Sequence, residues 1–181
     1  MAVLLHLNGP PGIGKSTLAA LWAERHPRTL DLDVDTLHLL VGGWRDPENR
    51  THEVLRPVAR AMASAYLATG RDVVLPQYLG RLGEVESFER VAHGQGAGFR
   101  EVVLLDDRDA AIARFDARRD DTAWNQHNRR VVAGLGGDAF LAAMYDRLLE
   151  VLQGRPGAVV VRSAPDAVEE TYSALEEAVA G

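Results

Sequence analysis

The stretch HLNGPPGIGKSTLAAL, residues 6–21, joins an apolar run to a glycine-rich segment and then to a helical pattern. Its central part, Gly9 to Ser16, fits the spacing G-x-x-x-x-G-K-[ST]. Glycines at these positions let consecutive main-chain N–H groups turn towards one point, where they bind phosphate oxygens together with the positive end of the following helix. The stretch therefore predicts a strand, a phosphate-binding loop and a helix, in that order.

Lys15 is the only lysine of the chain, and every other strongly basic side chain is an arginine. A compact ammonium group on a flexible stem suits the β- and γ-phosphates of a nucleotide better than a planar guanidinium does. In this motif Lys15 contacts those phosphates and Ser16 binds Mg²⁺. The alternative, a glycine-rich turn with an ordinary surface lysine, explains neither the flanking patterns nor the isolation of Lys15. The predicted ATP-binding residues of the loop are Gly9, Gly12, Ile13, Gly14, Lys15, Ser16 and Thr17.

The composition is that of one globular domain. The chain has 181 residues, of which 46% are hydrophobic and 25% are charged, which is enough to bury one core. No linker or repeat divides it, so we expect a single domain over residues 1–181, as a monomer or a homodimer. The net charge of −6 disfavours nucleic acid as a partner, because counterion release needs clustered basic side chains.

The chain has no cysteine, which excludes disulfides and thiolate metal sites and suits a reducing compartment. The apolar run from Ala2 to Leu7 lacks the length and the basic segment of a signal peptide. No stretch approaches the roughly 20 apolar residues of a membrane span. We therefore expect a cytoplasmic protein with no membrane partner.

Apolar runs bounded by turn residues alternate with segments of helical spacing, which is the pattern of β-α units around a parallel sheet. The predicted strands are residues 3–7, 29–32, 72–75, 101–105 and 158–161. The predicted helices are residues 16–25, 48–68, 84–92, 108–118, 138–153 and 166–179. The segment 119–137 begins polar and ends in glycines, so we expect a mobile excursion there instead of a core element.

The stretch TLDLDVDTLHLL, residues 29–40, places aspartates at alternate positions after an apolar start. Ligands of an open parallel sheet bind beyond the carboxyl ends of its strands, so this segment faces the same crevice as the phosphate loop. We expect Asp33 and Asp35 to overhang that crevice and Asp31 to be a solvated strand residue. The alternative for Asp35 is a helix N-cap before TLHLL, with the helix starting at about Thr36.

The motifs GPPGIGKST and LDVDTLH together resemble those of P-loop kinases of small molecules, within the AAA-type P-loop kinases. The resemblance is to the chloramphenicol phosphotransferase-like group and to its relatives among shikimate, gluconate and polynucleotide 5′-kinases. It implies a three-layer α/β/α fold with a five-stranded parallel sheet in the order 2-3-1-4-5, a short lid at about 119–137, and ATP and Mg²⁺ as cofactors. It also implies that Asp35 accepts the proton of the substrate hydroxyl and that Asp33 lies near the hydrated metal.

One position departs from the pattern of many P-loop ATPases, which carry a metal-binding aspartate after the strand beside the phosphate loop. Here that strand is followed by Pro76 and Gln77. The missing carboxylate disfavours a motor or an AAA-type ATPase that works through a helical lid domain. Asp33 is the expected replacement at the metal, through water, and Asp106 and Asp107 are weaker candidates.

Arginines gather before and after the expected lid. Arg114 and Arg118 lie four residues apart on one predicted helix, and Arg129 and Arg130 follow the lid. In the kinases that the chain resembles, lid arginines close over the phosphates and stabilise the charge of the transition state. We expect Arg118 to be catalytic and Arg114 to lie near the adenine. The alternative is a solvated helix with ion pairs along its surface.

We expect the acceptor to bind between the helix after Asp35 and the loop that contains Gln77. The polar and aromatic residues available there suggest a modest, polar, hydroxylated small molecule. The predicted substrate-binding residues are His38, Gln77, Tyr78 and Arg81, with Trp44 and Arg45 nearby in the sequence. The other histidines share no metal-ligand spacing, so we expect none of them to bind a metal.

These patterns predict an ATP-dependent phosphotransferase that moves the γ-phosphate to a hydroxyl group of a small molecule. Phosphoryl transfer needs positioning and charge neutralisation together with a carboxylate that orients and deprotonates the attacking hydroxyl. Two alternatives stay open. One is a regulatory P-loop ATPase that signals by lid closure, and the other is a polynucleotide kinase or a zeta-toxin-like kinase of nucleotide sugars.

Overall fold

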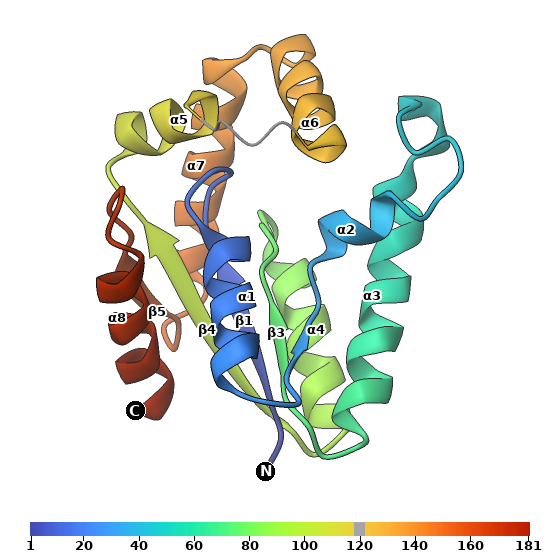
Figure 1. Cartoon of the computed structure of the whole chain (residues 1–181), viewed down its shortest axis with the longest axis vertical. Coiled ribbons are helices and arrows are strands. Elements are labelled where there is room, and N and C mark those ends of the chain that lie inside the picture. The colour runs from blue at the N-terminus through green and yellow to red at the C-terminus, as the bar shows by residue number, and fades with distance from the viewer. Residues whose placement is uncertain (118–121) are drawn as a thin grey trace.

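The computed structural model describes residues 1–117 and 122–181. At its centre is a parallel sheet of five strands in the order β2-β3-β1-β4-β5 (Figure 1). The predicted order of the sheet is therefore confirmed. The strands are β1 (Val3–Asn8), β2 (Leu30–Asp31), β3 (Val73–Leu75), β4 (Gly98–Leu105) and β5 (Val159–Arg162).

Helices cover both faces of the sheet, which gives the three layers expected from the sequence. On one face lie α1 (Lys15–Arg25) and α8 (Val168–Ala180), and on the other lie α3 (Thr51–Leu67) and α4 (Leu82–Gly94). Four further helices stand at the end of the sheet that carries the loop after β1, or run up to it (Figure 1). They are α2 (Val34–His38), α5 (Arg108–Asp116), α6 (Ala123–Gly134) and α7 (Asp138–Gln153).

The core has two parts because residues of β1 point alternately to the two faces of the sheet. Leu4 belongs to the cluster beneath α3 and α4, together with Leu75 and Phe88. Leu5 belongs to the cluster beneath α1 and α8, together with Leu104. The central strand is thus held on both sides, which fixes the start of the phosphate loop.

Most predicted elements are present, with ends shifted by a few residues. The predicted helix 48–68 begins only at Thr51, because Pro47–Asn49 forms a separate 3₁₀ turn and Arg50 takes a left-handed conformation with φ 43°. The strand predicted at 29–32 keeps only Leu30 and Asp31, since the chain leaves the sheet to start α2 at Val34.

The segment 119–137, expected to be a mobile excursion, contains a helix that the sequence patterns did not predict. Residues Ala123–Gly134 form α6, a regular helix whose N-cap is Thr122. The hydroxyl oxygen of Thr122 accepts a hydrogen bond from the main-chain N–H of Asn125 at 3.2 Å, which is the usual way to start a helix. Among residues 1–117 and 122–181, no helix has both the length and the apolar character to cross a membrane.

Candidate functional site

The phosphate loop connects β1 to α1 in a shape that depends on glycine. Gly12 has φ +85°, and a Cβ atom there would lie 2.9 Å from the main-chain nitrogen of Phe115 in α5. At Gly9 a Cβ atom would lie 2.7 Å from the carbonyl oxygen of Leu104 in β4. Both close approaches are to main-chain atoms that cannot move aside. The glycines therefore let α5 and β4 close around the loop.

The side chain of Lys15 folds back over this loop. Its Nζ donates hydrogen bonds to the carbonyl oxygens of Gly9 and Pro10, each at 2.9 Å. Gly14 precedes it in a left-handed conformation with φ 107° and caps α1. The ammonium group is thus held at the loop, beside the N-terminus of α1, where a phosphate would meet both positive charge and free N–H groups.

Ser16 and Thr17 follow in the first turn of α1, and Ile13 has a different role from its neighbours. The Ile13 side chain is completely buried, and its carbonyl oxygen accepts a hydrogen bond from the hydroxyl of Ser163 at 2.9 Å. Ile13 therefore anchors the loop in the core, and its main-chain N–H already donates to the carbonyl oxygen of Pro10 at 3.4 Å. Its assignment to ATP stays a prediction.

A cavity of about 190 Å³ opens beside the loop, between α5 and the segment after β5. Arg114 lines it, and one guanidinium nitrogen donates to the carbonyl oxygen of Ile13 at 3.0 Å. The other donates to the carbonyl oxygen of Ser163, and Asp106 lies 3.6 Å away. Arg114 was expected near the adenine; it borders this cavity, and its role stays a prediction.

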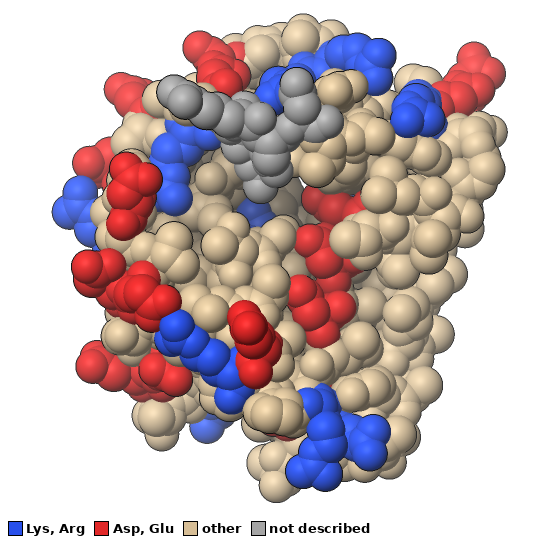
Figure 2. Space-filling model, viewed as in Figure 1, with Lys and Arg blue, Asp and Glu red and all other residues tan. Residues whose placement is uncertain are grey.

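Asp33 and Asp35 stand at the carboxyl end of β2. The carboxylate of Asp33 accepts a hydrogen bond from the main-chain N–H of Asp35 at 3.0 Å, so the N-cap of α2 is Asp33. The alternative assignment of Asp35 as that cap is therefore wrong. Asp35 lies in the first turn of α2 and is partly buried. Figure 2 shows acidic side chains along the β2–α2 connection, at the edge of a hollow in the surface.

Asp31 is not the solvated residue that the alternation pattern suggested. It is partly buried, and its Oδ1 atom is buried without a hydrogen-bond partner among the described residues. Burial raises the pKa of Asp31 to about 6, and the charge of Asp33 adds to this rise. Asp31 therefore holds its proton to a higher pH than an exposed aspartate does.

The residues predicted to bind the acceptor point in different directions. His38 is buried, and its Nδ1 lies 2.8 Å from the hydroxyl of Thr51. The Tyr78 hydroxyl donates to the carbonyl oxygen of Met144 in α7 at 2.8 Å, so this side chain ties the loop after β3 to α7. Arg81 is exposed at the start of α4.

Among the residues predicted to bind the acceptor molecule, Gln77 has a side-chain oxygen with no hydrogen-bond partner among the described residues. Its main-chain carbonyl oxygen lies 2.9 Å from Nε2 of His6 in β1. Its side-chain Oε1 is buried and has no hydrogen-bond partner within residues 1–117 and 122–181. A buried amide oxygen without a donor is costly, so it favours a donor group from a ligand at this place.

An aromatic cluster joins α6 to the α2–α3 region, and most of it was not predicted from the sequence. The His38 and Trp124 rings stack with centroids 4.5 Å apart, and Trp44 lies 5.7 Å from Trp124. His127 packs edge-on against Trp44 at 5.0 Å. The aromatic cluster consists of His38, Trp44, His52, Trp124 and His127. No local signal connects Trp44 with Trp124, because the pairing exists only once α6 forms.

Burial makes two histidines of the aromatic cluster poor bases. It lowers the pKa of His38 to about 4, and the neighbouring His52 and His127 add to this effect. Burial also lowers the pKa of His127, and the charge of Arg130 acts in the same direction. His38 is therefore neutral near pH 7.

Two predictions about this site stay predictions: the catalytic arginine and the metal ligands. Arg118, predicted to be catalytic, lies outside the described residues. Two residues were predicted to bind the metal: Ser16 lies in the first turn of α1, and Asp33 lies just after β2. Elsewhere in the described ranges no group of three or more His, Cys, Asp or Glu side chains is arranged to hold a metal ion. A divalent cation here would thus depend on a ligand's own phosphates and on water.

Comparison with known proteins gives one family model and solved structures of similar fold. Residues 4–135 match the family model of an AAA domain. The Deinococcus radiodurans tunicamycin resistance protein aligns with 99% of this chain and 96% of its own, with a TM-score of 0.61 and 16% identity. A gluconokinase from Sinorhizobium meliloti 1021 aligns with 97% of this chain and 94% of its own, with a TM-score of 0.56 and 18% identity. No curated protein sequence gave a significant match. At these identities the two structures share the fold.

Proposed function

Because the chain belongs to the AAA domain family of P-loop proteins, we propose that it binds ATP with Mg²⁺ and transfers the γ-phosphate to a hydroxyl group of a small molecule. The observation that carries the proposal is the pairing of two features at one end of the sheet. The phosphate loop with Lys15 follows β1, and Asp35 follows β2, with only β3 between these strands. A phosphoryl donor and a base can then face one crevice.

Family membership alone does not separate a kinase from an ATPase. Two features favour transfer to an acceptor over transfer to water. The segment after β3 has Pro76 and Gln77 instead of a metal-binding carboxylate, and an acidic pair stands across from the loop. The solved gluconokinase, which has the same fold, is by its name a kinase of a hydroxylated acid. We bring only the reaction type from it to this chain.

In the proposed reaction the hydroxyl oxygen of the acceptor attacks the γ-phosphorus of ATP. The bond between that phosphorus and the β–γ bridging oxygen breaks, and ADP leaves. The hydroxyl proton passes to the Asp35 carboxylate. Lys15 and the main-chain N–H groups of Gly12 to Ser16 neutralise the negative charge of the phosphates. We assign two arginines to the nucleotide as well. Arg118 would neutralise charge at the transferred phosphoryl group, and Arg114 would lie beside the nucleobase.

Magnesium would be held by the Ser16 hydroxyl and, through water, by Asp33. Both supply oxygen atoms, which suit this cation, and the phosphates of ATP would provide further ligands. The bound cation supplies charge neutralisation to the triphosphate. Neither oxygen of Asp33 accepts a hydrogen bond from a basic side chain among the described residues, and one of them accepts the N-cap bond. The other oxygen remains for a hydrated ion.

The acceptor would lie against α2 and the loop after β3. Gln77 offers an acceptor atom, and Arg81 offers an exposed charge at the start of α4. We keep Tyr78 and His38 as residues that shape the pocket, because their polar atoms already bind Met144 and Thr51. This arrangement suits a small polar molecule that carries several hydroxyl groups.

The test is a transfer assay with ATP labelled on the γ-phosphate and Mg²⁺. Candidate acceptors are first selected by the rise in melting temperature that each gives in the presence of a non-hydrolysable ATP analogue. The expected result is a labelled, phosphorylated acceptor with the wild-type chain and none with Asp35→Asn. Release of labelled phosphate to water at equal rates from both chains, with no acceptor labelled, would support a regulatory ATPase instead.

A further inference from the structure

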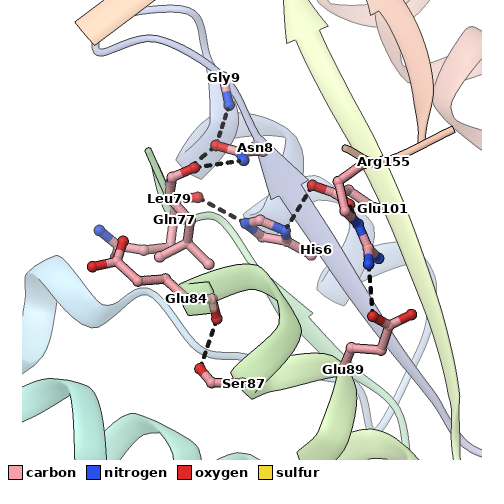
Figure 3. Close-up of polar contacts among 10 residues, drawn as sticks. All are labelled: His6, Asn8, Gly9, Gln77, Leu79, Glu84, Ser87, Glu89, Glu101 and Arg155. Atoms are coloured by element: carbon pink, nitrogen blue, oxygen red, sulfur yellow. Dashed lines mark hydrogen bonds and ion pairs between the residues drawn. The ribbon is translucent and has the colours of Figure 1, made fainter. Parts of the chain in front are cut away.

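Asn8 is the last residue of β1 and is completely buried. Its side chain makes three hydrogen bonds to main-chain groups (Figure 3). Oδ1 accepts from the N–H of Gly9 at 2.9 Å and from the N–H of Leu79 at 3.1 Å. Nδ2 donates to the carbonyl oxygen of Leu79 at 3.2 Å. One side chain therefore holds the first residue of the phosphate loop and the middle of the loop after β3.

Gly9 connects Asn8 to the lysine of the phosphate loop. The Gly9 residue offers its N–H to Asn8 and its carbonyl oxygen to Nζ of Lys15. A displacement of Lys15 or of Gly9 on phosphate binding would thus reach Asn8 through one residue, and Leu79 through the next. The path is short and consists only of hydrogen bonds between buried or partly buried groups.

The far end of the path is the acceptor segment, which we define as residues 77–81. It contains the proposed acceptor residues Gln77, Tyr78 and Arg81. A second bond from β1 reaches it, because the Nε2 atom of His6 lies 2.9 Å from the Gln77 carbonyl oxygen. The Leu79 side chain is buried in the core beneath α3 and α4. Side chains of β1 therefore hold the acceptor segment in place, and the same strand leads into the phosphate loop.

The chemistry of the site requires an amide. The oxygen accepts two N–H groups, and the nitrogen supplies a donor to a carbonyl group. An aspartate in this buried place lacks that donor when ionised, and an apolar residue leaves all three main-chain groups unpaired. No side chain other than asparagine has this combination at this length.

We propose that Asn8 is a positioning residue that couples occupancy of the phosphate loop to the geometry of the acceptor segment. The proposal rests on the proposed function, since it requires that the phosphate loop bind a nucleotide. It assigns Asn8 no contact with the nucleotide or with the acceptor. Binding of ATP would tighten residues 77–81 before the acceptor arrives, so the two substrates would bind cooperatively.

Hydrogen exchange of the full chain tests this without a known acceptor. With Mg²⁺ and a non-hydrolysable ATP analogue, the wild-type chain should exchange more slowly both in the phosphate loop, residues 9–15, and in the acceptor segment. In Asn8→Ala the loop should still be protected, while the ligand-dependent slowing at 77–81, about fivefold or more in the wild type, should disappear. The decisive quantity is the change on adding ligand, because the basal exchange of Leu79 rises when its partner is removed.

Two further variants separate coupling from loss of stability. Leu175→Ala truncates a completely buried side chain of α8, which packs in the other core cluster. It should lower the melting temperature yet keep the ligand-dependent slowing at 77–81. Asn8→Ser introduces a side chain that is too short to reach Leu79, and this variant replaces Asn8→Ala if Asn8→Ala does not fold. Asn8→Ser should also lose the ligand-dependent slowing at 77–81.

Three outcomes would overturn the proposal. One is slowing at 77–81 that persists in both Asn8 variants, and another is its loss in Leu175→Ala. The third is a wild-type chain in which the loop is protected and the acceptor segment is not; this leaves the proposed function standing. If ligand protects neither region of the wild type, the nucleotide-binding function itself fails, and the coupling fails with it.

Discussion

The carboxylate of Asp33 accepts a hydrogen bond from the main-chain N–H of Asp35 at 3.0 Å, so one aspartate fixes the backbone of the other. This bond starts α2 and places Asp35 in its first turn. The two residues share a type and a neighbourhood, yet they have different roles: Asp33 orients the helix, and Asp35 is the proposed base. Substitutions that remove one carboxylate at a time separate these roles.

Asp35→Asn should abolish phosphoryl transfer and leave ATP affinity within about twofold, because the base acts on the acceptor and not on the nucleotide. A positioned general base contributes about 10²–10⁴ in rate, which sets the expected loss. Initial rates with the acceptor found by screening, together with ATP titration, measure both quantities. Asp33→Asn is the matched control: asparagine also caps helices well, so α2 should persist and the loss of rate should be smaller. Wild-type turnover in Asp35→Asn would refute the assignment of the base.

Lys15→Ala should weaken ATP binding by roughly 10–100-fold, since hydrogen bonds to charged groups are worth about 1.5–3 kcal/mol each. Turnover should fall as well. Isothermal titration with ATP and Mg²⁺ measures the affinity, and Lys15→Arg is the control that keeps the charge but changes its shape. Its affinity should lie between those of the wild type and Lys15→Ala. An unchanged affinity in Lys15→Ala would show that the loop does not bind triphosphate through this lysine.

Asp31→Asn should stabilise the fold at pH 7 and above. The pKa of Asp31 is raised from 3.8 to about 6 in the folded chain, so folded Asp31 retains its proton between these pH values while the unfolded chain loses it. The free energy of unfolding therefore decreases as pH rises through this window. Removing the charge should raise it above pH 6 by on the order of 1–2 kcal/mol after allowance for solvent screening.

The measurement for Asp31 is urea unfolding at pH 4 and at pH 8. The gain in Asp31→Asn should be present at pH 8 and should be nearly absent below about pH 4. Asp116→Asn, at an exposed aspartate of α5, is the control and should change little at either pH. A gain of equal size at both pH values would mean that the buried charge is not its cause.

Acid should destabilise the chain through His38. The pKa of this buried histidine is lowered from 6.5 to about 4, so between these values the unfolded chain binds a proton that the folded chain does not. Its contribution to stability is complete above pH 6.5 and is lost as pH falls towards 4. The loss should be on the order of 2 kcal/mol and should loosen the contact of Trp124 with His38.

Melting temperatures from pH 7.5 to pH 4.5 measure this effect, with tryptophan fluorescence as a second signal. His38→Gln should show a smaller drop over the same range. Its remaining drop would come from other buried histidines, since burial also lowers the pKa of His6 to about 4. If the melting temperature falls equally in the wild type and in His38→Gln, the protonation of His38 is not the cause.

The phosphate loop and its two flanking elements were predictable because their signal is contiguous. Gly9 to Ser16 specify a local conformation, and the strand and helix around it follow from hydrophobic spacing alone. The order of the sheet came from the resemblance of two motifs, not from spacing. Which of Asp33 and Asp35 caps α2 was not predictable, since either can cap a helix by type.

The features that the sequence did not disclose depend on contacts between distant residues. Asn8 and Leu79 lie 71 positions apart, and nothing in the strand pattern distinguishes Asn8 from an ordinary last residue of a strand. The α6 helix was missed because its sequence starts polar and ends in glycines, and Trp124 finds its partners His38 and Trp44 only in the folded chain. The sequence pattern put Tyr78 in the loop after β3, but it gave no sign of the hydrogen bond to Met144, which lies 66 positions away.

The central position of β1 also bears on how the protein is made. The ribosome releases β1 first, yet its two neighbours in the sheet are β3, which ends at Leu75, and β4, which ends at Leu105. The carbonyl oxygen of Leu104 closes one side of the loop at Gly9. A nascent chain that stops short of β4 therefore has the complete phosphate-loop motif without the strand that closes one side of the loop. Under the proposed function, nucleotide should stabilise the chain only after β4 has been made.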